Sequence, residues 1–91
     1  GNQSNGTISL NFPSDVTLDA AGYLFIVDCY NHRIIGSDIN GYRCVVGCSG
    51  IGGSGPNELW YPWSLSFDSK GNLFVMDSNN HRIQKFMLMG N

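Results

Sequence analysis

The feature that most constrains this 91-residue chain is a repeat with a fixed spacing of 49 residues. The segment VDCYNHRI at residues 27–34 returns as MDSNNHRI at residues 76–83. When residues 10–34 are aligned with residues 59–83, 11 of the 25 positions are identical and no gap is needed. A repeat of this length is typical of solenoids, propellers and arrays, in which each unit packs against the next. The sequence therefore predicts two similar units, side by side.

Within each unit the apolar pattern predicts β-strands separated by short turns. SDVTLD and SLSFD alternate apolar and polar residues, as strands do. YLFIVD and NLFVMD are apolar at consecutive positions, which predicts a strand buried on both faces. A third strand follows the NHRI segment, and in the first unit NGY marks a hairpin into a fourth strand, YRCVVG. Each unit is predicted to be an antiparallel meander, which is the form of a β-propeller blade.

These segments resemble a known family of propeller blades. Pro13, DAAGYLFIVD and NHRI, with their second copies, resemble the NHL repeat, which is named for an Asn-His-Leu triplet. Both copies have Arg as the third letter, which is a common variant in such blades. The resemblance covers nearly the whole chain and implies an all-β, usually six-bladed propeller whose faces bind other molecules. The predicted divisions are an N-terminal segment at residues 1–9, blade 1 at residues 10–49, a Gly-rich linker at residues 50–58 and blade 2 at residues 59–91.

The second unit is shorter than the first. It stops at Asn91, the equivalent of Tyr42, so we expect it to lack a fourth strand. Two blades cannot close a ring, and open sheet edges expose unpaired backbone groups. The chain is therefore either a fragment of a larger propeller or a unit of a homotrimer with six blades. In the trimer, we expect residues 2–9 of one chain to replace the missing strand of the preceding chain. A solution mass of three times 10.0 kDa would support the trimer, and a mass of 10.0 kDa would indicate a fragment.

The doubled turn is predicted to be architecture rather than a catalytic or metal site. An active site rarely needs duplication, whereas every blade needs its turn. We expect the Asp carboxylate to bind turn amides and Arg, and His to fill the space between blades. The two His residues belong to successive blades and do not converge, and neither has a metal ligand at suitable spacing. We therefore expect no catalytic residue, no metal and no cofactor. The structural residues are Asp28, Asn31, His32, Arg33, Asp77, Asn80, His81 and Arg82.

Positions that differ between the copies are better candidates for ligand binding. Tyr30, Trp60 and Trp63 each face a small polar residue in the other copy, and meander geometry places all three at the same end of the blades. Exposed aromatic residues on one face suit contacts with proteins or glycans. The alternative is that the two Trp residues only pack under the Gly-rich loop. Phe12 and Tyr61 are aromatic in both copies, so we expect them in the core.

The three Cys residues leave the disulfide pairing open. Cys44 and Cys48 would lie about 13 Å apart in an extended strand, beyond disulfide reach, although a bulge at Gly47 would bring them together. Cys48 also lies at the same blade end as Cys29. We expect Cys48 to pair with Cys29 or Cys44, and the alternative is three buried thiols. A disulfide would indicate an oxidising compartment.

Charge and hydropathy exclude some partners. The net charge is −2 and the five Lys and Arg residues form no run, so we expect no nucleic-acid binding. No segment approaches the ~20 apolar residues of a membrane span, so we expect no membrane insertion. NQS at Asn2 and NGT at Asn5 are glycosylation sequons that weakly favour an extracellular location.

The predicted function is a non-enzymatic NHL-type propeller module that acts as a binding scaffold. The alternative is a fragment of a larger NHL-propeller enzyme, a metal-dependent lyase or a lactonase-like hydrolase, whose site exists only in the full ring. Bound zinc or calcium would favour the enzyme. A third interpretation is a structural product of repeat duplication that has no ligand.

Overall fold

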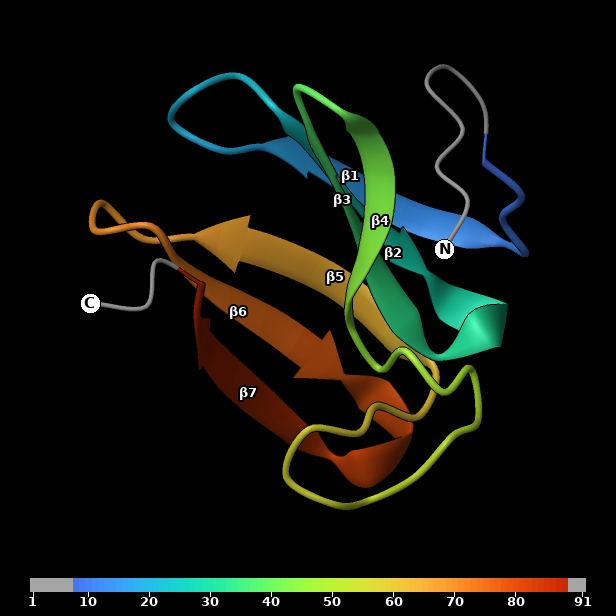
Figure 1. Cartoon of the computed structure of the whole chain (residues 1–91). Helices are drawn as coiled ribbons and strands as arrows, with labels where there is room; N and C mark the ends of the chain where they lie inside the picture. Colours follow the sequence, from blue (N-terminus) through green and yellow to red (C-terminus); the bar gives the residue numbers. More distant parts are fainter. Residues whose placement is uncertain (1–7, 89–91) are drawn as a thin grey trace.

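The computed structural model describes residues 8–88, which form two antiparallel sheets joined by a long linker (Figure 1). No α-helix occurs among these residues, and none of their segments is a helix able to cross a membrane. The first sheet has the order β1-β2-β3-β4, with β1 (Pro13–Leu18), β2 (Leu24–Asp28), β3 (Arg33–Asp38) and β4 (Gly41–Val46). The second has the order β5-β6-β7, with β5 (Pro62–Phe67), β6 (Asn72–Asp77) and β7 (Arg82–Met87). The predicted all-β meander is confirmed.

The 49-residue spacing of the sequence is kept in the geometry of the two sheets. The strand pair at the start of each sheet has a β-bulge at the equivalent place, between Pro13 and Asp15 and between Pro62 and Ser64. The second and third strands are joined in both sheets by a short 3-10 turn, η1 (Cys29–Asn31) or η2 (Ser78–Asn80). The two copies can therefore be compared position by position.

The Asp-x-x-Gly segments form the tight turns that their composition predicts. The Asp19 carboxylate accepts hydrogen bonds from the amides of Ala21 and Tyr23, at 3.0 Å and 2.9 Å. Gly22 has φ of 90°, a backbone conformation that favours glycine. Asp68 and Gly71 repeat this arrangement between β5 and β6.

The core lies between the two sheets. The rings of Phe25 and Phe67 meet edge to face, with centroids 4.9 Å apart. β2 is buried on both faces, as predicted, whereas Met76 of β6 is exposed because no further sheet covers that side. The prediction that the strand is buried on both faces is thus confirmed for β2 and wrong for β6. The buried cluster consists of Phe25, Val27, Cys29, Ile34, Val46, Leu59, Leu65, Leu73 and Val75.

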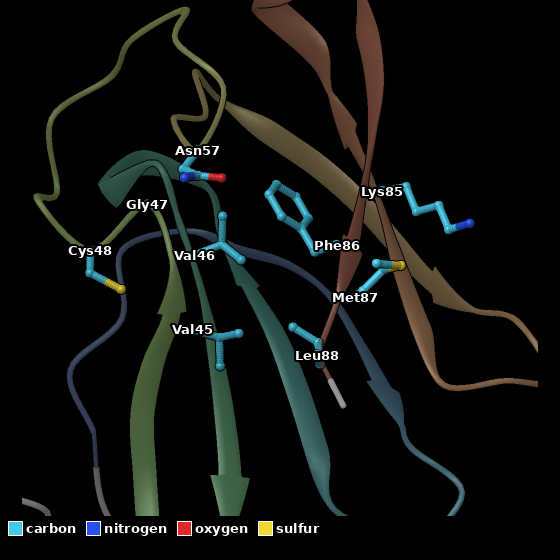
Figure 2. Close-up of a pocket in the computed structure, with 9 residues that line it drawn as sticks. All are labelled: Val45, Val46, Gly47, Cys48, Asn57, Lys85, Phe86, Met87 and Leu88. Atoms are coloured by element: carbon cyan, nitrogen blue, oxygen red, sulfur yellow. The ribbon is translucent and has the colours of Figure 1, made fainter. Parts of the chain in front are cut away.

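β7 is an edge of the second sheet within the described residues, and it faces β4 across a groove (Figure 2). Phe86 and Leu88 point from the β7 side toward Val45 and Val46, while Lys85 points away (Figure 2). Residues 2–9 are predicted to replace the missing strand of a neighbouring copy. Most of this segment, residues 2–7, lies outside the described part of the chain. Ser9 is described and is not in a strand.

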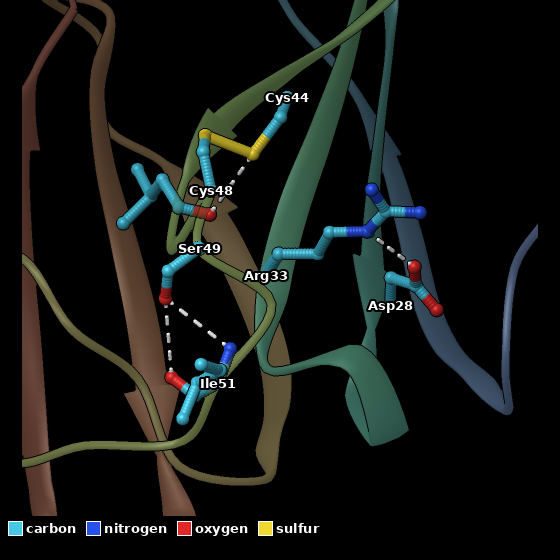
Figure 3. Close-up of a disulfide and its surroundings, with 7 residues drawn as sticks. Asp28, Arg33, Cys44, Cys48, Ser49 and Ile51 are labelled. Carbon is cyan, nitrogen blue, oxygen red and sulfur yellow. Dashed lines mark hydrogen bonds and ion pairs between the residues drawn. A yellow bond between two sulfur atoms is a disulfide. The ribbon is translucent and has the colours of Figure 1, made fainter.

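The structure joins Cys44 to Cys48 by a disulfide (Figure 3). Cys29 is a buried free thiol. The Cα atoms of the bonded pair are 5.7 Å apart, far closer than in an extended strand, because β4 ends at Val46 and Gly47 takes φ of 73°. A side chain at Gly47 would collide with the His32 carbonyl. Of the two pairings that the sequence left open, the structure has the one that turns at Gly47.

Candidate functional site

The doubled turn is built around a buried carboxylate at the end of β2. Asp28 Oδ1 accepts a hydrogen bond from the Asn11 amide at 2.7 Å. Asp28 Oδ2 accepts from Asn31 Nδ2 at 2.9 Å and from Arg33 Nε at 2.7 Å (Figure 3). A carboxylate removed from water is costly unless it is paired and hydrogen-bonded. Both oxygens of Asp28 are occupied in this way, so it has no free oxygen for chemistry.

The second copy repeats these contacts around Asp77 at the end of β6. Its oxygens accept from the Trp60 amide at 2.7 Å, from Asn80 Nδ2 at 2.9 Å and from Arg82 Nε at 2.8 Å. Burial by itself raises the pKa of Asp77, but these hydrogen bonds and the charge of Arg82 outweigh burial and lower the pKa below its usual value. The charged form of Asp77 is therefore the one that the fold stabilises.

The Arg of each turn also binds the segment that enters the blade. Arg33 Nη2 donates to the Ser9 carbonyl at 3.0 Å, and Arg82 Nη2 donates to the equivalent carbonyl of Glu58, also at 3.0 Å. Arg82 makes two further bonds, to the carbonyls of Ser54 and Gly55. The turn thus connects the sheet to its entering segment, which is an architectural role.

His32 lies between the two sheets. Its backbone is left-handed, with φ of 54°, and its Nδ1 accepts a hydrogen bond from the Tyr61 amide at 3.0 Å. The two rings meet edge to face with centroids 4.5 Å apart. His81 has the same backbone, with φ of 53°, but it is exposed. Within residues 8–88 no three His, Cys, Asp or Glu side chains are placed to share a metal ion.

Four aromatic rings form a continuous surface at the end of both sheets where these turns lie. Phe12 and Tyr30 are stacked with centroids 4.8 Å apart, and Phe12 also contacts Trp63 at 6.0 Å. Tyr30 meets Tyr61 edge to face at 5.6 Å. Each of the four residues is between 37% and 49% exposed. We call Phe12, Tyr30, Tyr61 and Trp63 the aromatic face.

Of the three aromatic residues that the sequence grouped together, Tyr30 and Trp63 contact other aromatic rings, whereas no ring contact of Trp60 occurs among the described residues. Tyr30 and Trp63 lie in the aromatic face, whereas Trp60 lies over the glycine-rich linker. A Cβ at Gly52 would lie 2.6 Å from Trp60 Cδ1 and 3.3 Å from His32 Cε1. Trp60 therefore packs on the linker, as the alternative interpretation expected of both Trp residues, and it is 44% exposed beside His32.

The expected core positions of Phe12 and Tyr61 are wrong. Both residues are exposed, and both have a left-handed backbone, with φ of 58° and 50°. This conformation, adopted just before β1 and β5, turns the side chain out of the alternation of the following strand. The residue before a proline normally has an extended backbone, so the sequence carried no signal for this left-handed conformation or for the exposure that goes with it.

Trp63 owes its exposed position to the β-bulge of β5. A bulge adds an unpaired residue to a strand and redirects its side chain. Trp63 lies between the paired residues Pro62 and Ser64, and its carbonyl accepts a hydrogen bond from Ser14 Oγ at 2.8 Å. Ser14 is the residue at the equivalent bulge in β1. The two bulges thus make a hydrogen bond between the sheets, and the bulge of β5 presents the indole to the surface.

Two adjacent antiparallel meanders, each with a buried Asp turn and packed face to face, define a pair of β-propeller-type blades. The sequence model of one family, described as the NHL repeat, matches residues 10–36 and 59–86. The chain therefore belongs to the NHL repeat family, as the sequence predicts. No curated protein matches the chain.

Proposed function

We propose that this chain is a non-enzymatic binding module that presents the aromatic face to a protein or glycan ligand, as part of a homotrimeric six-bladed ring. The observation that carries the proposal is the continuity of Phe12, Tyr30, Tyr61 and Trp63 on one surface that spans both sheets. Tyr and Trp contribute strongly at binding surfaces because a flat ring buries a large area and has few rotatable bonds.

The rings are held in place before a ligand arrives. Phe12 stacks on Tyr30 and also contacts the Trp63 ring, while the backbone of Trp63 is held by its bulge and by the Ser14 hydrogen bond to its carbonyl. A surface that is already ordered loses less side-chain freedom on binding, so more of the contact energy remains as affinity. This order supports a binding role rather than a surface with no ligand.

The non-enzymatic part of the proposal rests on the buried carboxylates. The Oδ atoms of Asp28 and Asp77 are occupied by amide and guanidinium donors, and each Arg is bound to its Asp and to backbone carbonyls. A general acid or base must be free to exchange a proton with a substrate. The lyase or hydrolase alternative would have to use other residues.

The ring is supported by large apolar side chains that are exposed on the outer sides of the two sheets, namely Val16 and Leu18 on the first and Met76 and Ile83 on the second. The Cys44–Cys48 disulfide further supports an oxidising, extracellular setting. Light scattering tests the ring, and the expected mass is three times the 10.0 kDa of one chain.

The binding role is tested by replacing each aromatic residue with the residue that the other blade has at the same position. Trp63→Ser and Tyr30→Asn use Ser14 and Asn79 as their models, so the blade geometry already accepts these residues. Ligands are first selected with the wild-type chain on a glycan array and from a peptide library. Each variant is expected to weaken binding by about tenfold or more, the effect of losing a central aromatic contact.

Tyr23→Asn is the matched control. Tyr23 is 37% exposed, lies at the opposite end of the blade, and has Asn72 as its equivalent. It is expected to leave the affinity unchanged. If the selected ligands bind Trp63→Ser and Tyr30→Asn as tightly as the control, the aromatic face is not the binding surface.

A further inference from the structure

We propose that the two open ends of this chain bind each other between copies, and that this contact repeats the internal contact of the two sheets. The inference rests on the trimeric ring proposed above and names its interface. The leading face is the exposed part of the outer side of the first sheet, along β1, with Val16 and Leu18; Ile26 and Ile35 on the same side are already buried within the chain. The trailing face is the open side of the second sheet, with Met76 and Ile83.

The trailing face has the residues that the first sheet buries against the second. Val27 and Ile34 are both 0% exposed in the internal contact. Their equivalents, Met76 and Ile83, are 45% and 68% exposed. The side chains are again large and apolar, and they occupy the same positions on strands of the same register. What differs is that no sheet within the described residues covers them.

The leading face supplies the other half of this contact. Leu65, on the side of the second sheet that meets the first, is 7% exposed, and its equivalent Val16 is 54% exposed. Phe67 packs against the core, whereas its equivalent Leu18 is 56% exposed. One chain therefore has both halves of one interface, on opposite ends, and it cannot bring them together by itself.

A hydrogen bond of the internal contact also has an equivalent pair of groups on the leading and trailing faces. Inside the chain the Tyr61 amide donates to His32 Nδ1. The equivalent pair is the Phe12 amide on the leading face and His81 on the trailing face. Phe12 and Tyr61 share a left-handed backbone, as do His32 and His81. Within residues 8–88 neither the Phe12 amide nor the His81 ring makes a hydrogen bond. In the assembled contact, the Phe12 amide of one copy donates to His81 Nδ1 of the next.

Two other polar contacts of the internal interface do not transfer. Asp15 Oδ2 accepts from the Leu65 amide at 3.1 Å in the internal contact. The equivalent pair is Ser64 and the Val16 amide, but the Val16 amide already donates to Asp15 Oδ1 of its own chain at 2.9 Å. The bond from Ser14 Oγ to the Trp63 carbonyl does not transfer, because Trp63 itself has the position of Ser14.

The occupant of each open face is thus a second copy of this chain. A contact between two different surfaces of one molecule passes from copy to copy, and it ends only when the copies close a ring. With two blades per chain, three such contacts close a ring of six. The established internal interface is the template, so the partner needs no residue that the chain lacks.

Ile83→Glu tests the interface, because it places a charge where the apolar contact forms. It is expected to reduce the light-scattering mass from three times 10.0 kDa to the 10.0 kDa of a single chain, at concentrations where the wild-type chain is trimeric. Ile39→Glu is the matched control: Ile39 is 86% exposed on the turn between β3 and β4, outside both faces. The control is expected to remain a trimer, and both variants to keep the wild-type far-UV circular dichroism.

The double variant Val16→Lys, Ile83→Glu tests the pairing directly. Each variant alone places a charge on one face, whereas together they place a positive charge on the leading face and a negative charge on the trailing face that it meets. The double variant is expected to recover trimer that Ile83→Glu loses. His81→Ala is expected to weaken assembly about fivefold per contact, as expected for one hydrogen bond.

The possible outcomes test the proposed interface and the proposed ring separately. A wild-type chain that keeps the mass of a single copy, 10.0 kDa, at all concentrations would overturn both. A wild-type trimer that tolerates Ile83→Glu would keep the ring and overturn the interface. If Ile83→Glu dissociates the trimer and the double variant restores nothing, the pairing of the leading face with the trailing face is wrong.

Discussion

At the scale of single residues, the buried carboxylates are the parts of the molecule most sensitive to substitution. Asp28 joins the Asn11 amide, Asn31 and Arg33, so removing it leaves three donors without their acceptor. Removing one partner of a buried pair costs far more than the pair contributes when it is intact. The turn therefore depends on one carboxylate.

Asp28→Ala is expected to lower the free energy of unfolding by about 3 kcal/mol, as measured by urea denaturation. Asp38→Ala is the control, because the Asp38–Arg43 pair, at 3.2 Å, is exposed on both sides. Exposed pairs contribute little, so this variant is expected to cost less than about 1 kcal/mol. Equal losses in the two variants would contradict the importance of burial.

Acid is expected to destabilise the fold through Asp77. Its pKa is lowered in the folded state, so its contribution to stability is complete above the unfolded pKa of about 3.9 and is lost as the pH falls through the folded pKa. Unfolding free energies measured between pH 6 and pH 2 should fall below about pH 4. In Asp77→Asn this fall should be smaller, and an unchanged fall would contradict the assignment.

The thiol of Cys29 is expected to be unreactive in the folded chain. Burial raises its pKa, with the neighbouring charge of Asp28 adding to the effect and Ser14 opposing it, so the reactive thiolate is scarce at neutral pH. A thiol reagent such as DTNB should react slowly with the native chain and should titrate one thiol after unfolding. Rapid reaction of the native chain would contradict the burial of Cys29.

At the scale of the elements, the disulfide fixes the end of β4 and the start of the linker. The loop that it closes spans a sequence separation of four residues, so the entropy that it removes from the unfolded chain is small. Reduction by dithiothreitol is expected to cost about 2 kcal/mol of unfolding free energy. Cys29→Ser, which copies Ser78 of the second blade, should leave this cost unchanged, whereas Cys48→Ser should abolish it.

The strands of this fold could be predicted because each depends on a local apolar pattern, and the repeat supplied two examples of each. The φ of Phe12 could not, because a left-handed backbone in a non-glycine residue is stabilised by tertiary contacts rather than by its own sequence. The exposure of Met76 could not be predicted either, because only a neighbouring sheet would bury that face. The choice of the Cys44–Cys48 pairing could not be made from the sequence, because it depends on where β4 ends.

At the scale of the whole molecule, assembly and stability are expected to be linked. Ile83 and Val16 are exposed in the single chain and become covered in the proposed ring. If that ring forms, folding and association stabilise each other, and the melting temperature should rise with protein concentration. Calorimetry over a hundredfold range of concentration would measure this rise. Ile83→Glu should melt at one temperature throughout, and a concentration-dependent melt in that variant would count against the coupling.

The presence of two sheets in one chain also imposes a rule of parity. Any closed assembly built only from copies of this chain has an even number of blades, because blades are added in pairs. Rings of four, six or eight blades have masses of two, three or four times 10.0 kDa, and a ring of five or seven cannot be made. The angle between the two sheets, repeated at each contact between copies, then determines which even number of blades closes the ring.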